Sequence, residues 1–325
     1  MSAQEELDLV TIENLQEADL AEADHIFRLA FGTFIGVPDP ASFHQGADYV
    51  RTRWTADPAA AFAARIKGKL VGTNFATNWG SVGFFGPLTI HPDFWDRGVG
   101  RHLIDPVLDL FARWGVKQAG LYTFAQSQKH IALYQKFGFW PRFLTAIMSL
   151  EVASEETEAI GELETYSALS PDEREKALES CRKLTNEIYE GLDVRREILS
   201  IVKQNLGDSI LLRDDSGLVG LAACHCGEGS EAGPDVCYVK FAAVRPTSVG
   251  SNASVNFERL LSACLTLAVR CGLSRVLAGV NTARTDAYKQ MIRRGFKTQM
   301  QGVAMHAPNE PGYNQSGVFI LDDWR

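Results

Sequence analysis

The stretch Leu88–Gly100 (LTIHPDFWDRGVG) carries the clearest chemical signal in the chain. An apolar strand runs into a proline turn and then into a short loop, and Arg97–Gly100 lies where this loop joins a helix whose amphipathic run begins at Arg101. Glycines let the backbone approach a ligand closely, and a helix N-terminus offers unpaired N–H groups and a positive dipole end. The pattern predicts a pyrophosphate site, although an ordinary strand–turn–helix corner fits these residues equally well.

Cys224-His225-Cys226 is a second grouping with chemical potential, because thiolates and imidazoles are common zinc ligands. On a strand, Cys224 and Cys226 would face one side and His225 the other, so the three side chains cannot converge on one ion. No further Cys/His pair follows at zinc-site spacing. The sequence therefore predicts buried cysteines and no bound metal.

The elements that position these residues belong to a chain of 325 residues, long enough for roughly two domains. Its 46% hydrophobic and 22% charged residues are typical of a globular protein. No apolar run approaches the ~18 residues of a membrane span, and the acidic N-terminus is unlike a secretory signal. Six cysteines, all in the second half and without a C-x-x-C pair, favour a reduced, cytoplasmic protein. Because no apolar run is long enough, we expect no membrane partner.

The net charge of −8 is concentrated in one segment. Residues 151–164 contain six glutamates and neither lysine nor arginine, so the two flanking halves are nearly balanced. A connector accounts for the acidity, which carries little information about a partner. No basic stripe is present, and we therefore expect no nucleic-acid partner.

Hydrophobic periodicity predicts alternating strands and helices in the first half. Strands are expected at 7–13, 60–65, 70–77, 81–90, 118–124 and 141–150, and helices at 17–31, 47–54, 98–114 and 128–137, with a loop at 32–46. The second half repeats this order. Strands are expected there at 163–168, 209–213, 218–226, 235–244, 275–279 and 318–322, and helices at 171–190, 195–204, 254–271 and 285–294.

Two short motifs recur about half a chain apart. Ile90-His91-Pro92 corresponds to Val244-Arg245-Pro246 at an offset of 154, and Gly138-Phe139 corresponds to Gly295-Phe296 at an offset of 157. Nearly equal offsets indicate an internal duplication, with the acidic connector between the copies.

The strand–loop–helix, the later run Tyr134–Phe139 (YQKFGF) and the repeat together resemble a tandem protein of the GNAT (GCN5-related N-acetyltransferase) superfamily. The resemblance covers roughly 8–150 and 162–325. It implies an α/β (α+β mixed) class with two tandem GNAT folds, each a central, mostly antiparallel mixed sheet flanked by helices. It also implies a catalytic acetyl-CoA-binding domain at 1–150, an acidic connector at 151–162 and a degenerate GNAT-like domain at 163–325.

The resemblance implies that backbone N–H groups from about 95 to 101 hold the pyrophosphate of acetyl-CoA. The family pattern Gln/Arg-x-x-Gly-x-Gly/Ala matches at Gly98 and Gly100 and departs at Trp95. A backbone N–H near Leu88 is the expected oxyanion donor. Ser127 replaces a family asparagine and could instead cap a helix. The expected cofactor-binding residues are Leu88, Thr89, Ile90, Trp95, Asp96, Arg97, Gly98, Val99, Gly100, Arg101 and Ser127.

Tyr134, four residues before Gly138-Phe139, is the catalytic acid that the resemblance implies. A phenol with a pKa of about 10 is protonated at neutral pH and can donate to the departing sulfur, although a tyrosine that only packs is the alternative. The second half has Met291 at this place, which cannot donate a proton. Its loop has Val249, Asn252 and Ser254 at the three recognition positions, so we expect that half to have lost acetyl-CoA binding, unless Gly250 shifts the loop.

The general base is left open by the sequence. Residues 81–90 and 118–124 contain no carboxylate, although relatives often place a glutamate there. His91, Asp39 and His44 are the candidates, and a water relay without a dedicated residue is equally compatible.

The sequence thus predicts an N-acetyltransferase that transfers acetyl from acetyl-CoA to an amine by direct attack in a ternary complex. The alternative is a non-catalytic acyl-CoA-binding or sensor protein with the same fold. The partner is expected to be a small-molecule or peptide amine, and the chain a monomer or homodimer. Small amines, aminoglycosides, amino acids and protein amines all stay open as acceptors.

Overall fold

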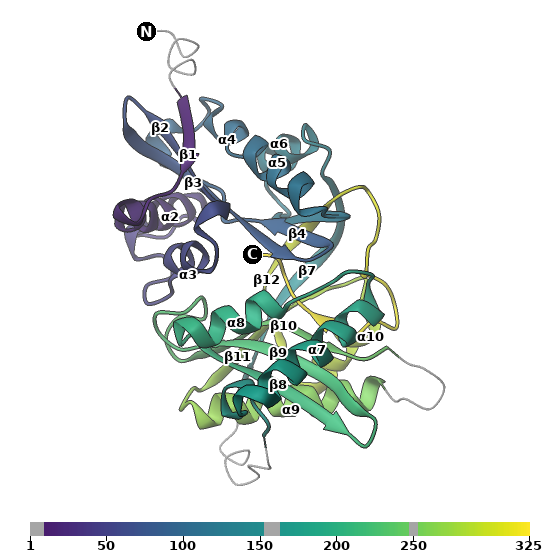
Figure 1. Cartoon of the computed structure of the whole chain (residues 1–325). Helices are drawn as coiled ribbons and strands as arrows, with labels where there is room; N and C mark the ends of the chain where they lie inside the picture. Colours follow the sequence, from purple (N-terminus) through teal and green to yellow (C-terminus); the bar gives the residue numbers. More distant parts are fainter. Residues whose placement is uncertain (1–9, 153–162, 247–252) are drawn as a thin grey trace.

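The computed structural model describes residues 10–152, 163–246 and 253–325 (Figure 1). The start of the expected first strand, most of the connector, and Val249, Gly250 and Asn252 fall outside these ranges. The elements of the first half are β1 (Val10–Asn14), α2 (Leu20–Ile35), α3 (Tyr49–Ala56), β2 (Ala61–Ile66), β3 (Lys69–Trp79), β4 (Val82–Phe85), β5 (Thr89–Ile90), α4 (Val99–His102), α5 (Asp105–Trp114), β6 (Gln118–Phe124), α6 (Gln128–Gln135) and β7 (Trp140–Glu151).

The second half repeats part of this succession, beginning with two helices and ending with an additional short strand. Its elements are α7 (Pro171–Ile188), α8 (Arg195–Gln204), β8 (Gly207–Asp214), β9 (Gly217–Cys226), β10 (Val236–Val244), α9 (Ala253–Arg270), β11 (Arg275–Asn281), α10 (Thr285–Arg294), β12 (Lys297–Ala307) and β13 (Ile320–Leu321).

Two expectations from the sequence were wrong, and one strand was missed. The strand at 163–168 is a single bridge from Thr165 to Ile210 followed by a 3-10 turn. The helix at 98–114 is broken into α4 and α5, because Pro106 removes an N–H and starts a new helix. The strand β12 was not predicted at all.

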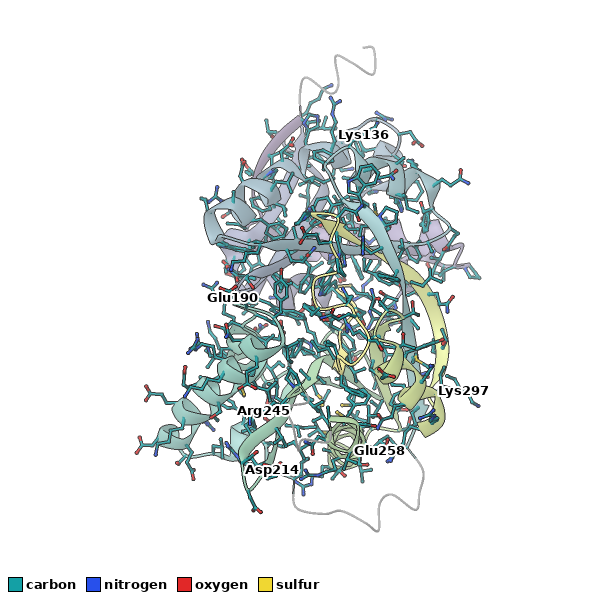
Figure 2. All side chains as sticks on the ribbon, turned by 90° about the vertical axis from the view of Figure 1, so that its right-hand side faces the viewer. Lys136, Glu190, Asp214, Arg245, Glu258 and Lys297 are labelled. Atoms are coloured by element: carbon teal, nitrogen blue, oxygen red, sulfur yellow. The ribbon has the colours of Figure 1, made fainter. Side chains whose placement is uncertain are left out.

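Strand pairing joins the two halves into one sheet among the described residues. The order is β1-β2-β3-β4-β6-β12-β7-β11-β10-β9-β8, with β5 beside β3 and β13 beside β10. The halves exchange strands at the centre: β12 of the second half pairs with β6 and β7 of the first, and β7 pairs in turn with β11. Figure 2 shows β7 and β12 running side by side between the two ends of the molecule, with Lys297 at the start of β12.

Helices cover both faces of the sheet in the first half. On β2 the inward residues alternate, so that Ala61 and Ala63 pack under α2 and α3 while Phe62 and Ala64 pack under α4 and α5. The cluster under α2 and α3 centres on Ile26, Phe27 and Phe75. No described helix is both long and apolar enough to cross a membrane.

A separate apolar cluster fills the junction between the halves. The Trp79 ring lies 5.2 Å from that of Phe241, and the Phe84 ring is stacked on Trp324 at 6.2 Å. Trp324 comes from the last residues of the chain, which return between the two halves beside β4 (Figure 1). The junction is therefore packed as a core, which fixes the second half against the sheet that carries the loop Leu88–Gly100.

Candidate active site

The strands β4 and β6 are parallel neighbours that separate halfway along. Val82–Phe84 pairs with Gln118–Gly120, and pairing stops there. The chain bends at Gly86 and Pro87, after which β5 pairs only with β3. A cavity of about 850 Å³ opens where the strands part, with residues 86–90 on one wall and residues 122–124 on the other.

The N–H groups of Leu88 and Ile90 are directed into this opening. Thr89 pairs with Thr73 of β3, and the N–H of His91 donates to the Val71 carbonyl at 2.9 Å. Because successive N–H groups of an extended chain point in opposite directions, those of Leu88 and Ile90 face away from β3. They can pair with a carbonyl or an oxyanion placed in the cavity.

The loop that follows β5 bends back over the same cavity. Asp96 and Gly98 both have left-handed backbone conformations, with φ of 62° and 75°. The cavity is lined by most of the residues expected to bind a cofactor, namely Leu88, Thr89, Ile90, Trp95, Asp96, Gly98, Val99, Gly100 and Arg101. A Cβ at Gly100 would make ordinary contacts with Leu88 and Leu133, whereas any side chain at Gly98 would strain the backbone.

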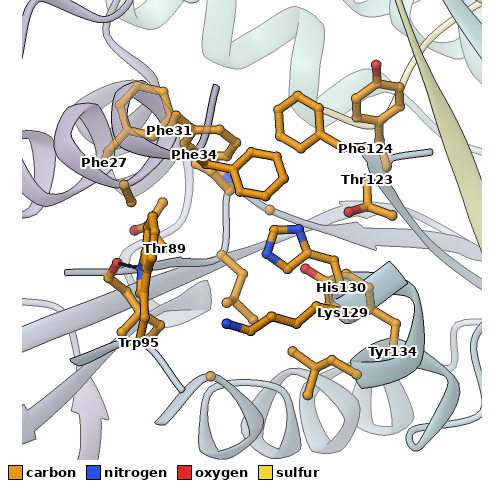
Figure 3. A pocket seen from close by; sticks show the side chains of 18 of the residues that line it. Phe27, Phe31, Phe34, Thr89, Trp95, Thr123, Phe124, Lys129, His130 and Tyr134 are labelled. Carbon is orange, nitrogen blue, oxygen red and sulfur yellow. Dashed lines mark hydrogen bonds between the residues drawn. The ribbon is translucent and has the colours of Figure 1, made fainter. Parts of the chain in front are cut away.

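Trp95, which departs from the family pattern, is held by the strand it follows. Its indole Nε1 donates to the Ile90 carbonyl at 2.7 Å, so the ring lies against β5 and forms one wall of the cavity (Figure 3). Across the opening, the Lys129 ammonium of α6 forms an ion pair with Asp96 of the loop. This pair is largely exposed and marks the solvent end of the site.

Tyr134 lies on the α6 side of the same cavity. Its ring packs edge-on against Phe85 at 5.8 Å and is 8% exposed. Burial raises the pKa of the Tyr134 phenol, which keeps the group protonated at neutral pH. No described residue hydrogen-bonds to the hydroxyl, which lies in the cavity wall.

Other candidates from the sequence lie away from the cavity or have structural roles. The Ser127 hydroxyl accepts from the N–H of His130 at 3.4 Å and caps α6, without lining the cavity. The His91 Nδ1 accepts from the N–H of Asp93 at 3.2 Å and so caps the turn after β5. The Arg97 guanidinium lies over the Phe94 ring. Asp39 also lies outside the cavity lining.

Aromatic rings form the wall opposite the loop, and the sequence analysis did not identify them as a site. Phe27, Phe31 and Phe34 stand on one face of α2 at spacings of four and three. Phe34 is 4.9 Å from Phe124 of β6 and 4.9 Å from the His130 ring (Figure 3). Their helical spacing was the available signal, but the predicted helix ended at residue 31.

His44 also belongs to this wall. Its ring lies 4.5 Å from that of Phe43 and 6.1 Å from that of Tyr49. Burial, together with the charges of Arg325 and Arg28, lowers the pKa of His44 to about 4. At neutral pH it is therefore an uncharged imidazole with a free lone pair.

The matching opening in the second half is closed by the chain itself. At the offset of 154, Leu88 and Thr89 correspond to Ala242 and Ala243 of β10. These two residues pair with Leu321 and Ile320 of β13, and the N–H of Val244 donates to the Phe319 carbonyl. The strand β13 thus occupies in the second half the place that is open in the first.

The helices beside this closed slot are also joined. The Ser254 hydroxyl lies 3.0 Å from Gln290 Oε1, and Gln290 Nε2 donates to the Ser254 carbonyl and to Glu258. Gln290 corresponds to Leu133, which lines the first-half cavity. Met291, at the place of Tyr134, is fully buried in the core.

Cys224-His225-Cys226 lies in β9 and holds no metal-like cluster. His225 Nε2 is 3.5 Å from Glu197 Oε1, and Lys240 Nζ is 3.1 Å from the same oxygen. Burial opposes ionisation of Glu197, but Lys240 lowers its pKa to about 2. Within the part of the chain that the structure describes, no group of three or more His, Cys, Asp or Glu side chains is arranged to hold a metal ion.

This geometry agrees with a comparison of the sequence with known families. Residues 23–139 match the acetyltransferase (GNAT) family. The matched segment contains β4, β5, the loop, α6 and Tyr134. No curated protein matches the sequence.

Solved structures with a GNAT fold resemble the whole chain. A candidate acetyltransferase from Pyrococcus horikoshii superposes with a TM-score of 0.65 at 13% identity, over 96% of this chain and 93% of the other. A GCN5-related N-acetyltransferase from Sphaerobacter thermophilus superposes with a TM-score of 0.59 at 15% identity, over 92% of this chain and 95% of the other. A GCN5-related glucosamine N-acetyltransferase region of a fungal multi-domain enzyme superposes with a TM-score of 0.58 at 14% identity, over 91% of this chain and 38% of the other. The likenesses confirm the predicted fold class.

Proposed function

We propose that the first half transfers an acetyl group from acetyl-CoA to a primary amine, and that the second half is a degenerate copy without this activity. The observation that carries the proposal is the cavity that opens between β5 and β6. Leu88, whose N–H faces the cavity, and Tyr134 both line it. The pantetheine arm would lie along β5, and the pyrophosphate against the backbone of residues 95–101.

In the proposed reaction the amine nitrogen attacks the thioester carbonyl carbon, and the C–S bond breaks. The N–H of Leu88 donates to the oxygen on which negative charge develops. The Tyr134 hydroxyl donates its proton to the departing sulfur, and the proton lost by the nitrogen restores the phenol by way of solvent. Because burial raises the pKa of Tyr134, transfer has to accompany bond cleavage rather than precede it.

The proton of the attacking amine needs an acceptor, and we assign this role to His44, directly or through water. It lines the cavity and has a pKa lowered to about 4, so its lone pair is available throughout the neutral range. The Arg325 charge on the same wall disfavours an ammonium and so favours the neutral, nucleophilic amine.

Two features support a second half without acetyl-CoA binding. The strand β13 pairs with Ala242 and Ala243, where the pantetheine arm would otherwise lie. Gln290 joins the N-terminus of α9 to α10, and the carboxylate of Glu258, which is ion-paired with Arg294, stands where a pyrophosphate would otherwise approach.

Tyr134→Phe tests the proposal, since it removes the proton but keeps the ring. We expect kcat to fall by about 10²- to 10³-fold with little change in acetyl-CoA affinity. The matched control is Tyr288→Phe in α10, which should leave the rate unchanged. An unaltered kcat in Tyr134→Phe would refute the assignment of the acid, and acetyl-CoA binding without transfer to any amine would favour the acyl-CoA sensor instead.

A further inference from the structure

Four phenylalanine rings lie next to one another on the cavity wall opposite the loop Leu88–Gly100, and we call them the ring wall: Phe31, Phe34, Phe43 and Phe124. Phe31 is stacked on Phe43 with 5.6 Å between ring centroids and lies 6.1 Å from Phe124. Phe34 lies 4.9 Å from Phe124 (Figure 3). The rings come from α2, the loop that follows it and β6, so tertiary packing gathers them into one surface.

The ring wall stays partly open although its members pack on one another. Each of the four side chains is only partly buried, and together they line a cavity of about 850 Å³. Apolar surface of this kind gains free energy when a ligand covers it. An aromatic ligand gains most, because ring pairs add stacking and edge contacts to the area that they bury.

The second half shows that the fold itself does not require these rings. Its first helix, α7, has the place of α2 in the succession of elements and contains no aromatic residue, and β11, at the place of β6, contains none either. At the offset of 157, Phe124 corresponds to Asn281, which donates a hydrogen bond to Thr145. Because β13 closes the slot of the second half, the rings accompany the open cavity rather than the fold.

The ring wall offers no partner for a second positive charge on an acceptor. Among the described residues that line the cavity, Asp96 is the sole side-chain carboxylate, and it lies at the solvent end in an ion pair with Lys129. The His130 ring lies 4.9 Å from that of Phe34. Burial lowers the pKa of His130 and Lys129 adds to this, so the imidazole is neutral at neutral pH.

Arg325 also lines the cavity, but it is committed to the protein. Its Nε is 3.0 Å from Oδ1 of the buried Asp323, and its Nε and Nη2 atoms are themselves buried. Its main-chain oxygen accepts a hydrogen bond from Arg53. The other lysine and arginine residues of the described lining, Arg101, Lys129 and Lys136, lie on the loop and on the α6 side, where the pyrophosphate is proposed to bind. A carboxylate on the acceptor would therefore gain no ion pair at the ring wall.

We infer that the acceptor is a primary amine whose body is an uncharged aromatic ring, which is the chemistry of an arylalkylamine. Its ring packs on the ring wall, and its amine, once unprotonated, reaches the thioester carbonyl beside Leu88. A second ammonium, a carboxylate or several hydroxyls would lose water on this wall without gaining a partner, which disfavours polyamines, amino acids and amino sugars. The inference rests on the proposed function, because it assigns the ring wall to the acceptor of that reaction.

A series of acceptors tests the inference. Ethylamine lacks the ring of 2-phenylethylamine, L-phenylalanine adds a carboxylate to it, and spermidine and glucosamine carry further ammonium or hydroxyl groups. With acetyl-CoA, we expect kcat/KM for 2-phenylethylamine to exceed that for ethylamine by about 100-fold. It should exceed the values for L-phenylalanine, spermidine and glucosamine by about tenfold or more.

Phe34→Ala removes the ring at the centre of the ring wall. It should lower kcat/KM for 2-phenylethylamine by about tenfold and that for ethylamine by less than about twofold, with the affinity for acetyl-CoA unchanged. Phe124→Leu, on the neighbouring strand, should act in the same direction. Phe143→Ala is the matched control, because Phe143 is an exposed phenylalanine of β7 outside the cavity lining, and it should leave both values unchanged. An equal loss for both acceptors in Phe34→Ala would overturn the assignment of the ring wall to the acceptor.

Two further outcomes would overturn the inference and leave the proposed acetyltransferase intact. One is preferred transfer to L-phenylalanine, spermidine or glucosamine. The other is a ring wall that holds the acyl group, shown by faster transfer from hexanoyl-CoA than from acetyl-CoA to ethylamine and by loss of this advantage in Phe34→Ala.

If no amine is acetylated, the proposed function fails by itself, and binding decides the inference. Saturation-transfer NMR then measures the binding of 2-phenylethylamine to the CoA-loaded protein. Binding that is lost in Phe34→Ala and kept in Phe143→Ala supports the inference, and absence of binding overturns it.

Discussion

The Arg53 guanidinium donates a hydrogen bond to the Gly86 carbonyl, 2.5 Å away, and so ties helix α3 to the bend between β4 and β5. The same guanidinium pairs with both oxygens of Glu231, at 2.9 and 3.0 Å. Arg53 and Glu231 are 4% and 0% exposed as side chains. A carboxylate of the second half therefore orients the residue that holds the start of the segment leading to Leu88.

Removing Arg53 should cost much of the stability of the junction. Arg53→Met leaves Glu231 buried with Lys240 as its remaining ionic partner, and we expect the free energy of unfolding to fall by about 3–5 kcal/mol. Urea denaturation measures this. The double variant Arg53→Met with Glu231→Leu should lose less free energy of unfolding than Arg53→Met alone. Arg51→Met, at an exposed position, should change the free energy of unfolding little. If the double variant had a lower free energy of unfolding than Arg53→Met alone, the ion-pair explanation would be contradicted.

Gly120 and Trp324 should be coupled in stability. A Cβ at residue 120 would lie 2.1 Å from the Trp324 ring, so Gly120→Ala forces the indole out of its stack on Phe84. We expect this overpacking to lower the free energy of unfolding by about 1–3 kcal/mol. Combining Gly120→Ala with Trp324→Leu should give a loss well below the sum of the two single losses. Additive losses would mean that the ring does not occupy this position.

Stability should fall in mild acid because His306 is buried without charge. Burial lowers the pKa of His306 from 6.5 to about 4. Between pH 6.5 and 4 the unfolded chain binds the additional proton, so the contribution of His306 to the free energy of unfolding is complete above pH 6.5 and decreases as the pH falls. At pH 4.5 His306 should cost roughly 2–3 kcal/mol.

The variant His306→Gln isolates this contribution. The His306 Nδ1 pairs with the Glu310 carbonyl at 2.7 Å, so the variant loses some stability at pH 7. Its further loss between pH 7 and pH 4.5, measured by urea denaturation, should be smaller than that of the wild type by roughly 2–3 kcal/mol. An identical decrease in both proteins would show that His306 is not held neutral.

Acetyl-CoA should bind once per chain, in the first half. Calorimetric titration should give one equivalent, and Gly98→Asp should abolish binding, because the φ of 75° disfavours a side chain and the carboxylate repels phosphate. Gly272→Asp is the matched control: it has a φ of 68°, carries the same added charge and lies outside the cavity lining. Two equivalents, or one remaining in Gly98→Asp, would contradict the degenerate second half.

Local patterns were sufficient for most elements. The bounds predicted for β6, α8 and α10 are those observed, because the hydrophobic periodicity and, for the two helices, the left-handed residues Asn205 and Gly295 that end them lie in the local sequence. Short motifs also indicated most of the residues between Leu88 and Arg101 that line the cavity, and Tyr134 beside them, whereas the predicted residues Arg97 and Ser127 lie outside the lining.

The parts that the sequence did not reveal depend on distant contacts. Residues 297–307 begin with exposed polar side chains and contain Gly302, so they show no clear alternation, and their strand character comes from pairing with β6 and β7. Trp324 and Arg325 have no motif at all. They reach the cavity because β13 pairs with β10, and that pairing follows from tertiary structure rather than from any local preference.

The exchanged strands also determine when the central sheet can form during synthesis on the ribosome. The inner edge of β6, at residues 118–124, finds its partner only when residues 297–307 have been made. At about 5–20 residues per second, the first half waits roughly 10–35 s with an unpaired central edge. Such an edge is a template for intermolecular pairing, so newly made chains should be most prone to aggregate during this interval. Nascent chains are therefore expected to need chaperones from the completion of β6 until β12 has emerged from the ribosome.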